Sequence, residues 1–280
     1  MDDYRAASLQ SWSSVAPDWG ELADRIDEQL QPAAEWIIEA VAPRPGDRVL
    51  ELAGGPGTLS ILIAGRVSPD GTVLHSDFSE EMVKVAGQRF ESAGIGSIES
   101  RVIDAEQIDL PDESMDVVVC RMGYMLMADP AAALRESGRV LTADGRLALA
   151  VWTDASSNPW VSLAMQAIAG ELNAPPPPPD APGLWALGDP ERVGVLLRDA
   201  GLNEIRIEIL DGTAEYESGQ QWVEATKRLA GPLRALFANL EQPVREAIER
   251  RMLELATQFE QSDGRLVMPQ QMLVAGARRV

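Results

Sequence analysis

The sequence is poor in the residues that most often carry redox, metal or acid–base chemistry. Its 280 residues include one cysteine, Cys120, and one histidine, His75. A single cysteine excludes an intramolecular disulfide and a Cys-x-x-Cys redox pair, and with a single histidine it also excludes a Cys/His zinc cluster. We therefore expect no metal site, and any histidine-based catalysis would have to use His75.

Long apolar runs are also missing. A transmembrane helix needs about 18 or more consecutive apolar residues, and the sequence has no such run. The start of the chain, MDDYRAASLQSWSSVAPDWGE, has neither the basic n-region nor the apolar h-region of a secretory signal. We therefore expect a cytoplasmic protein without membrane insertion.

Positive charge is scarce. The chain has 24 Lys and Arg against 44 Asp and Glu, which gives a formal net charge of −20. Binding to nucleic acid or to anionic lipid depends on clustered basic residues, so neither partner is expected. Hydrophobic residues make up 45% of the chain, which is enough for a sizeable core in one or two domains.

Short apolar segments alternate with helical segments over the first half of the chain. Strands are expected at 47–53, 72–77, 98–103, 115–120 and 146–152, with helices at 58–67, 79–93 and 130–141. Continuous apolar strands separated by helices are typical of a parallel sheet that is buried on both faces.

The second half is less regular. Helices are expected at 160–172 and 189–200, strands at 203–210 and 271–277, and a long helical stretch at 220–259 broken near Pro232 and Pro243. The proline run at 175–179 predicts an extended surface connector, and a ligand for a proline-recognition domain is the remote alternative.

A Gly-rich turn, ELAGGPG at 51–57, joins the first strand to the first helix. Small residues let the backbone turn sharply and approach a ligand, and the helix that follows presents free N–H groups. Asp77 ends the second strand about twenty residues later, where a carboxylate can accept two hydrogen bonds from a ribose diol. This combination indicates a nucleoside ligand.

Two nucleoside cofactors fit such a turn. The segment GPGTLS at 55–60 resembles G-x-G-x-x-G with Ser in the last place, as in nicotinamide-binding proteins. Glu51 before the glycines and Asp104-Ala105-Glu106 after the third strand favour S-adenosylmethionine instead, because a carboxylate at that edge can accept the adenine amino group. Alternatively, Asp104 is a helix-cap or turn residue, or Glu51, Asp77 and Asp104 are solvated strand ends.

Four stretches together resemble class I S-adenosylmethionine-dependent methyltransferases, in particular the ubiquinone/menaquinone-biosynthesis-type small-molecule enzymes. They are VLELAGGPGTLSILIA, DFSEEMVKVA, DAEQIDLPDESMDVVV and ALRESGRVLTADGRLALAVW, and they lie within residues 47–152. The chain departs from the family pattern at Ala53, where the first Gly of the turn is common, and at Met115, where Phe is usual.

The resemblance implies an α/β, Rossmann-like fold with a seven-stranded, mostly parallel sheet, helices on both faces and an antiparallel last strand. It predicts an N-terminal helical lid at 1–46 and a cofactor-binding core at 47–211 with a helical, proline-rich insertion at 153–188. A helical substrate-cap insertion is expected at 212–265, and the last core strand at 266–280.

The resemblance also implies which residues bind the cofactor, S-adenosyl-L-methionine. Glu51 would lie near the methionine amino group, Asp77 at the ribose hydroxyls and Asp104 at the adenine amino group. The full expected set is Glu51, Ala53, Gly55, Gly57, Asp77, Phe78, Asp104, Ala105, Cys120 and Trp19.

Three residues are candidates for catalysis: Tyr124, Arg121 and His75. Transfer from a sulfonium has a good leaving group, so alignment and desolvation supply much of the acceleration, but an oxygen acceptor also needs deprotonation. His75 lies inside the second strand, where a structural or cofactor-adjacent role is the alternative. Tyr124 follows the fourth strand, where helix packing is the alternative.

The acceptor is expected to contact Trp12, Tyr124, Met125, Trp152 and Asn158, with ordinary packing as the alternative for each. Soft methionines after the fourth strand suit an irregular apolar ligand. The predicted activity is O- or C-methylation of a small, largely apolar acceptor that is aromatic, quinone-like or a secondary metabolite. A cofactor-binding protein without methyl transfer (regulatory, or cyclase- or decarboxylase-like) and an NAD-dependent oxidoreductase are alternatives, and a homodimer is left open.

Overall fold

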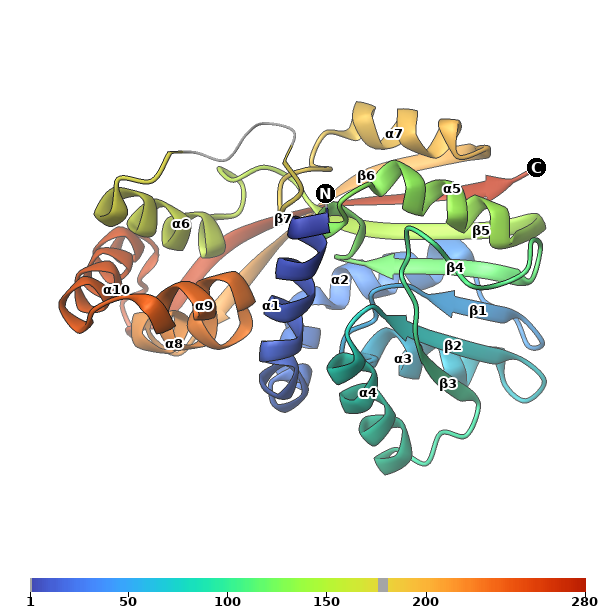
Figure 1. The fold of residues 1–280 in the computed structure, drawn as a ribbon, viewed down its shortest axis with the longest axis horizontal. Coiled ribbons are helices and arrows are strands. Elements are labelled where there is room, and N and C mark those ends of the chain that lie inside the picture. Colours follow the sequence, from blue (N-terminus) through green and yellow to red (C-terminus); the bar gives the residue numbers. More distant parts are fainter. Residues whose placement is uncertain (1, 176–180) are drawn as a thin grey trace.

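The structure is a computed structural model that describes residues 2–175 and 181–280. Within these residues, seven strands form one sheet in the order β3-β2-β1-β4-β5-β7-β6 (Figure 1). The strands are β1 (Arg48–Glu51), β2 (Thr72–Asp77), β3 (Ile98–Val102), β4 (Met115–Arg121), β5 (Leu141–Trp152), β6 (Leu202–Tyr216) and β7 (Leu266–Arg279).

Strands β1 to β5 pair in parallel, and β7 runs antiparallel to both of its neighbours, β5 and β6. In Figure 1, α2 and α3 lie behind the sheet and α5 lies in front of it, so helices cover both faces. The predicted Rossmann-like fold with an antiparallel last strand is confirmed.

The helices and 3-10 turns are α1 (Asp2–Glu21), α2 (Ala23–Val41), α3 (Thr58–Val67), α4 (Glu80–Ser92), η1 (Tyr124–Leu126), α5 (Pro130–Val140), α6 (Pro159–Leu172), α7 (Pro190–Asp199), α8 (Gly219–Leu229), α9 (Gly231–Asn239), α10 (Gln242–Ala256) and η2 (Thr257–Phe259). The long helical stretch breaks at the two expected places. Apart from Pro175, the expected proline run falls outside the described residues. Across the part of the chain that is described, no helix is long and apolar enough to cross a membrane.

Strands β6 and β7 are longer than the sequence indicates. Residues 211–216 of β6 pair with residues 266–271 of β7 beyond the end of β5, which stops at Trp152 opposite Met272. The strands expected at 203–210 and 271–277 were therefore too short. In this two-stranded ribbon, the added residues of β6, DGTAEY, form no apolar run, and those of β7, LVMPQQ, include a proline and two glutamines.

The ribbon carries a second apolar core, away from the sheet. We call residues 212–265 the cap block, and its buried side chains pack with α6. They include Trp222, Val223, Leu233, Phe237, Ile248 and Met252. The main core lies instead around the sheet, where α2 packs with Ile37 and Val41 fully buried. The second half of α2 is therefore part of the main core.

Helix α1 lies between the sheet domain and the cap block (Figure 1). The Trp19 indole donates a hydrogen bond to the Leu229 carbonyl oxygen at 2.9 Å. Asp18 accepts from both Arg228 and Arg234, each at 2.7 Å, and this pairing lowers the pKa of Asp18. The cap block thus fixes the position of α1 through polar contacts with the C-terminal half of that helix.

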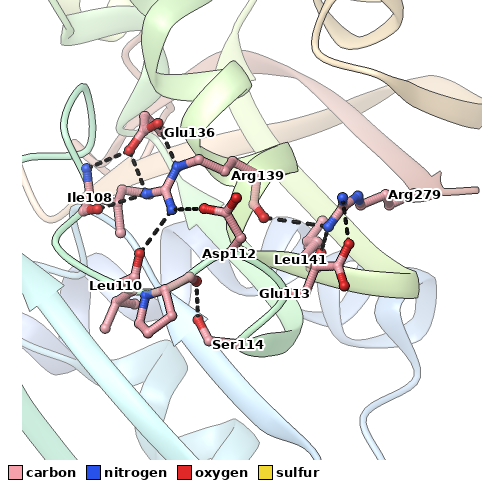
Figure 2. Close-up of polar contacts among 10 residues, drawn as sticks. Ile108, Leu110, Asp112, Glu113, Ser114, Glu136, Arg139, Leu141 and Arg279 are labelled. Carbon is pink, nitrogen blue, oxygen red and sulfur yellow. Dashed lines mark hydrogen bonds and ion pairs between the residues drawn. The ribbon is translucent and has the colours of Figure 1, made fainter.

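Arg139 of α5 anchors the loop between β3 and β4 (Figure 2). Its guanidinium donates to the carbonyl oxygens of Leu110 at 2.9 Å and Ile108 at 2.8 Å. It also binds the carboxylates of Asp112 at 2.6 Å and Glu136 at 2.7 Å. These contacts raise the pKa of Arg139 and lower that of Glu136. A loop that begins at the expected adenine-binding residues is therefore held from its far side.

We expect Arg139→Ala to lower the free energy of unfolding by about 3 kcal/mol, because several charge-assisted hydrogen bonds to the loop are lost together. The exposed Arg135 of the same helix, which lies 3.9 Å from Asp129, provides the control. Arg135→Ala should cost less than about 0.5 kcal/mol. Denaturant unfolding measures both variants, and equal losses would show that Arg139 does not anchor the loop.

Candidate active site

A cavity opens where the carboxyl ends of β1, β2 and β4 meet. Parallel strands end at the same edge of a sheet, and in this fold class ligands bind outside that edge. The cavity's walls come from α1, the first half of α2, the Gly-rich turn and the loops after β2, β3 and β4. Its lining includes Trp12, Trp19, Asp27, Leu30, Glu51, Ala53, Gly55, Asp77, Phe78, Met82, Asp104, Ala105, Glu106, Arg121, Met122, Leu126 and Met127.

The Gly-rich turn faces this cavity with its backbone. Ala53 and Gly55 adopt positive φ angles of 50° and 53°, a region that favours glycine but is tolerated at a small residue. A side chain at Gly55 would meet no atom within 4 Å, whereas one at Gly57 would reach within 2.4 Å of Phe90. Gly55 therefore borders open space that a ligand can approach, and Gly57 is required by packing.

Two buried carboxylates stand at the ends of β1 and β2. Glu51 is 1% exposed and accepts a hydrogen bond from the Ser60 hydroxyl. Asp77 is 6% exposed and accepts from the backbone N–H of Gly55 at 3.1 Å and of Ser79 at 2.9 Å. Burial raises the pKa of Glu51 to about 7 and that of Asp77 to about 6. Both groups have remaining acceptor capacity toward the cavity.

The third expected carboxylate, Asp104, is paired with a residue of α1. The Arg5 guanidinium forms ion pairs with Asp104 and with Glu106, the latter at 2.5 Å. Glu106 is held in turn by the Ala128 N–H at 2.9 Å. This pairing attaches the N-terminal half of α1 to the loop after β3, next to the expected position of the adenine.

The only histidine does not face the cavity. The His75 Nε2 lies 3.1 Å from the Gly55 carbonyl oxygen and the Nδ1 lies 2.8 Å from the Ser100 hydroxyl. The ring packs edge-on against Phe90 at 5.4 Å. Burial lowers the pKa of His75 to about 4. Because a carbonyl can only accept, Nε2 carries the proton, and the ring fixes the Gly-rich turn instead of reaching an acceptor.

Several other expected site residues also lie outside the cavity. The Tyr124 hydroxyl is bonded to Ser137 at 2.7 Å, and the residue is fully buried. The Met125 sulfur accepts from the Trp152 N–H, and burial raises the pKa of the Cys120 thiol to about 12. All three side chains pack in the core: Cys120 lies within β4, and Tyr124 and Met125 begin η1 after it.

Trp152 and Asn158 likewise serve packing and not the cavity wall. The Trp152 ring packs against Trp160 at 4.9 Å. Asn158 accepts from the Gln271 N–H at 2.9 Å and donates to the Gln271 carbonyl oxygen at 3.1 Å. Asn158 therefore joins the start of α6 to β7, which is the loop-packing alternative.

Helix α1 provides most of the aromatic part of the cavity wall. Trp12 and Trp19, both expected from the sequence, pack edge-to-face at 5.6 Å and line the cavity. Tyr4 and Ser8 lie on the same face, and the Tyr4 hydroxyl donates to the Leu126 carbonyl oxygen at 2.8 Å. Positions 4, 8 and 12 share one helix face, so helical spacing from Trp12 could have identified Tyr4 and Ser8.

One charged pair in the cavity was not expected. Arg121, at the end of β4, binds Asp27 of α2 at 2.9 Å. Arg121 was a candidate from the sequence, but Asp27 has no motif around it that could have identified it.

Comparison with known proteins supports the family. The methyltransferase domain family matches residues 49–145. Nocamycin O-methyltransferase of Saccharothrix syringae is 32% identical over 209 residues, which is 70% of this chain and 75% of that protein. The chain belongs to the S-adenosylmethionine-dependent methyltransferases. S-adenosylmethionine is therefore its cofactor, and its residues at the sheet edge fit that role.

A second group of relatives of this methyltransferase matches over a shorter length. The ubiquinone/menaquinone biosynthesis C-methyltransferase UbiE of Paraburkholderia phymatum is 37% identical over 135 residues, 48% of this chain and 55% of that protein. The chain thus spans about half the length of this relative.

Solved structures share the fold of the methyltransferase. The YcgJ protein of Bacillus subtilis superposes with a TM-score of 0.63 at 19% identity, covering 89% of this chain and 99% of that one. The cyclase SpnF superposes with a TM-score of 0.51 at 18% identity, covering 89% of this chain and 80% of that one.

The expected contact between Glu51 and the cofactor's amino group predicts a pH dependence. A bound ammonium favours the charged carboxylate, so binding should release a proton wherever free Glu51 is still protonated. With a pKa of about 7, the affinity for S-adenosylhomocysteine should fall about tenfold from pH 8 to pH 6. Calorimetry across this range tests it. Glu51→Gln should abolish this fall in affinity between pH 8 and pH 6. An unchanged pH profile in that variant would contradict the assignment.

The placement of Tyr124 predicts that its hydroxyl serves stability. Tyr124→Phe should lower the free energy of unfolding by about 1 kcal/mol through the lost bond to Ser137. The affinity for S-adenosylhomocysteine should stay within twofold. A tenfold loss of affinity at unchanged thermal stability would instead place the hydroxyl at the ligand.

Proposed function

We propose that this methyltransferase transfers the methyl group to an oxygen or carbon of a small, largely apolar acceptor. The observation that carries the proposal is the composition of the cavity. The lining combines buried carboxylates at the ends of β1 and β2 with apolar side chains of α1 and of the loop after β4. A polar cofactor and an apolar acceptor can therefore lie side by side there.

The residues proposed for the cofactor are those that line the cavity. Glu51 would bind the amino group, Asp77 the ribose hydroxyls and Asp104 the adenine amino group. Gly55 and Phe78 would lie against the nucleoside. When bound, the cofactor supplies an electrophilic methyl group, and the chain's own part is to orient it and to exclude water.

The proposed acceptor site is the wall formed by Trp12, Trp19, Leu126 and Met127. Flat aromatic walls bury apolar rings well, and methionine adapts to irregular shapes. An aromatic, quinone-like or secondary-metabolite acceptor suits these side chains. The name of the nocamycin O-methyltransferase supports transfer to an oxygen of a small-molecule acceptor. The name of the C-methyltransferase UbiE supports transfer to a carbon atom.

The proposed reaction proceeds without a histidine base. His75 is bonded on both ring nitrogens and has a pKa near 4, so it is neutral and directed away from the acceptor. An acceptor that loses its proton readily, such as a phenol or an enol, would need little help. In this proposal the cap block supports α1 and does not contact the acceptor.

The test has two stages. Calorimetry should show binding of S-adenosylhomocysteine and none of NAD(H), and Asp77→Ala should weaken binding more than tenfold. Asp109→Ala is the control, because that side chain is fully exposed and should leave binding unchanged. Binding of NAD(H) without S-adenosylhomocysteine would overturn the cofactor assignment.

The second stage incubates labelled S-adenosylmethionine with a library of phenolic, quinone and enol acceptors and maps products by mass spectrometry. Label on oxygen or carbon of an apolar acceptor is expected. Tight cofactor binding without transfer to any acceptor would favour a cofactor-binding protein that acts without methyl transfer.

A further inference from the structure

The ion pair between Arg121 and Asp27 is largely buried in the cavity wall. It joins the end of β4 to α2, with Nη2 and Oδ1 2.9 Å apart. The two side chains are 9% and 19% exposed, and both line the cavity. A salt bridge this buried is weak evidence for stability, because desolvation offsets much of the attraction. Its position in the cavity wall calls for a ligand-binding explanation.

Arg121 retains hydrogen-bonding capacity. A guanidinium has five N–H donors in a planar fork that matches a carboxylate. Among the described residues, Asp27 is its one hydrogen-bond partner, at a single nitrogen. The remaining donors belong to a side chain that is nine-tenths buried and borders the cavity, so an anionic group there would satisfy them.

Arg121 also lies beside Glu51. Strands β1 and β4 are neighbours, with Val119 beside Glu51 in the register, and Arg121 follows Val119 by two residues. The charge of Arg121 lowers the pKa of Glu51, and that of Asp27 raises it. One cation and two carboxylates are therefore grouped in the same part of the wall.

We propose that Arg121, held in place by Asp27, binds the α-carboxylate of the cofactor's amino-acid end while Glu51 binds the α-ammonium. The two ligand charges sit on one α-carbon, so their receptors have to be neighbours, as the ends of β1 and β4 are. The fork of Arg121 binds the carboxylate through its free donors. Asp27 is a positioning residue that fixes the guanidinium. This inference rests on the proposed cofactor site.

Three ligands separate the contributions in calorimetry. S-adenosylhomocysteine carries both charges. Its decarboxylated analogue, 3-aminopropylthio-adenosine, keeps the ammonium alone. Methylthioadenosine has neither. For the unaltered protein, affinity should fall at each step along this series, with at least a tenfold loss on removing the carboxylate.

The variant to compare is the double substitution Asp27→Asn with Arg121→Met. It removes both charges, so no unpaired charge is left buried. It should lower the affinity for S-adenosylhomocysteine at least tenfold. The affinities for the other two ligands should stay within twofold of those of the unaltered protein. Arg121→Lys keeps the charge without the fork and should give an intermediate loss. Glu51→Gln should weaken both amine-bearing ligands and spare methylthioadenosine.

Arg101→Met is the matched control, because Arg101 is a half-exposed arginine of β3 outside the cavity, and it should change none of the affinities. Equal weakening of all three ligands by the double variant, or no weakening at all, would overturn the assignment. Equal affinity of the unaltered protein for all three ligands would also overturn the assignment of Arg121, but it would leave the proposed cofactor site standing. Failure of all three ligands to bind would instead contradict the proposed function.

Discussion

The site depends on one constraint, the parallel pairing of β1 between β2 and β4. In this register Glu51 stands beside His75 on one side and Val119 on the other. All three strands therefore end at one edge, and residues distant in sequence come together there. Their side chains are buried by neighbouring loops, which raises the pKa values of Glu51 and Asp77. Strand order and register therefore decide which residues meet at the cavity.

The rest of the molecule holds that edge in shape. Arg139 fixes the loop after β3 from behind, and His75 fixes the Gly-rich turn through the Gly55 carbonyl oxygen. On the open side, α1 is attached at its start by Arg5 and near its end by Trp19. Charge-assisted or buried hydrogen bonds thus hold each of these elements in position around the cavity.

The sequence was most informative where a local pattern has one structural outcome. The apolar runs and the Gly-rich turn predicted the sheet, the cofactor edge and the residues Glu51, Asp77 and Asp104 that line the cavity. It was least informative where a side chain can turn either way after a strand. Tyr124 and Met125 turn into the core, whereas Arg121, the last residue of β4, lines the cavity. Asp27 and Arg5 reach the site only through tertiary packing of helices, which no local spacing encodes.

The contacts of α1 with the cap block have an evolutionary consequence. Gly231 of α9 packs so closely on Ser11 that a side chain there would come within 2.4 Å of the Ser11 carbonyl oxygen. A bulkier residue at that point would shift the helix that carries Trp12. Under the proposed acceptor site, substitutions in the cap block would reshape the acceptor wall while every residue around the cofactor stays the same.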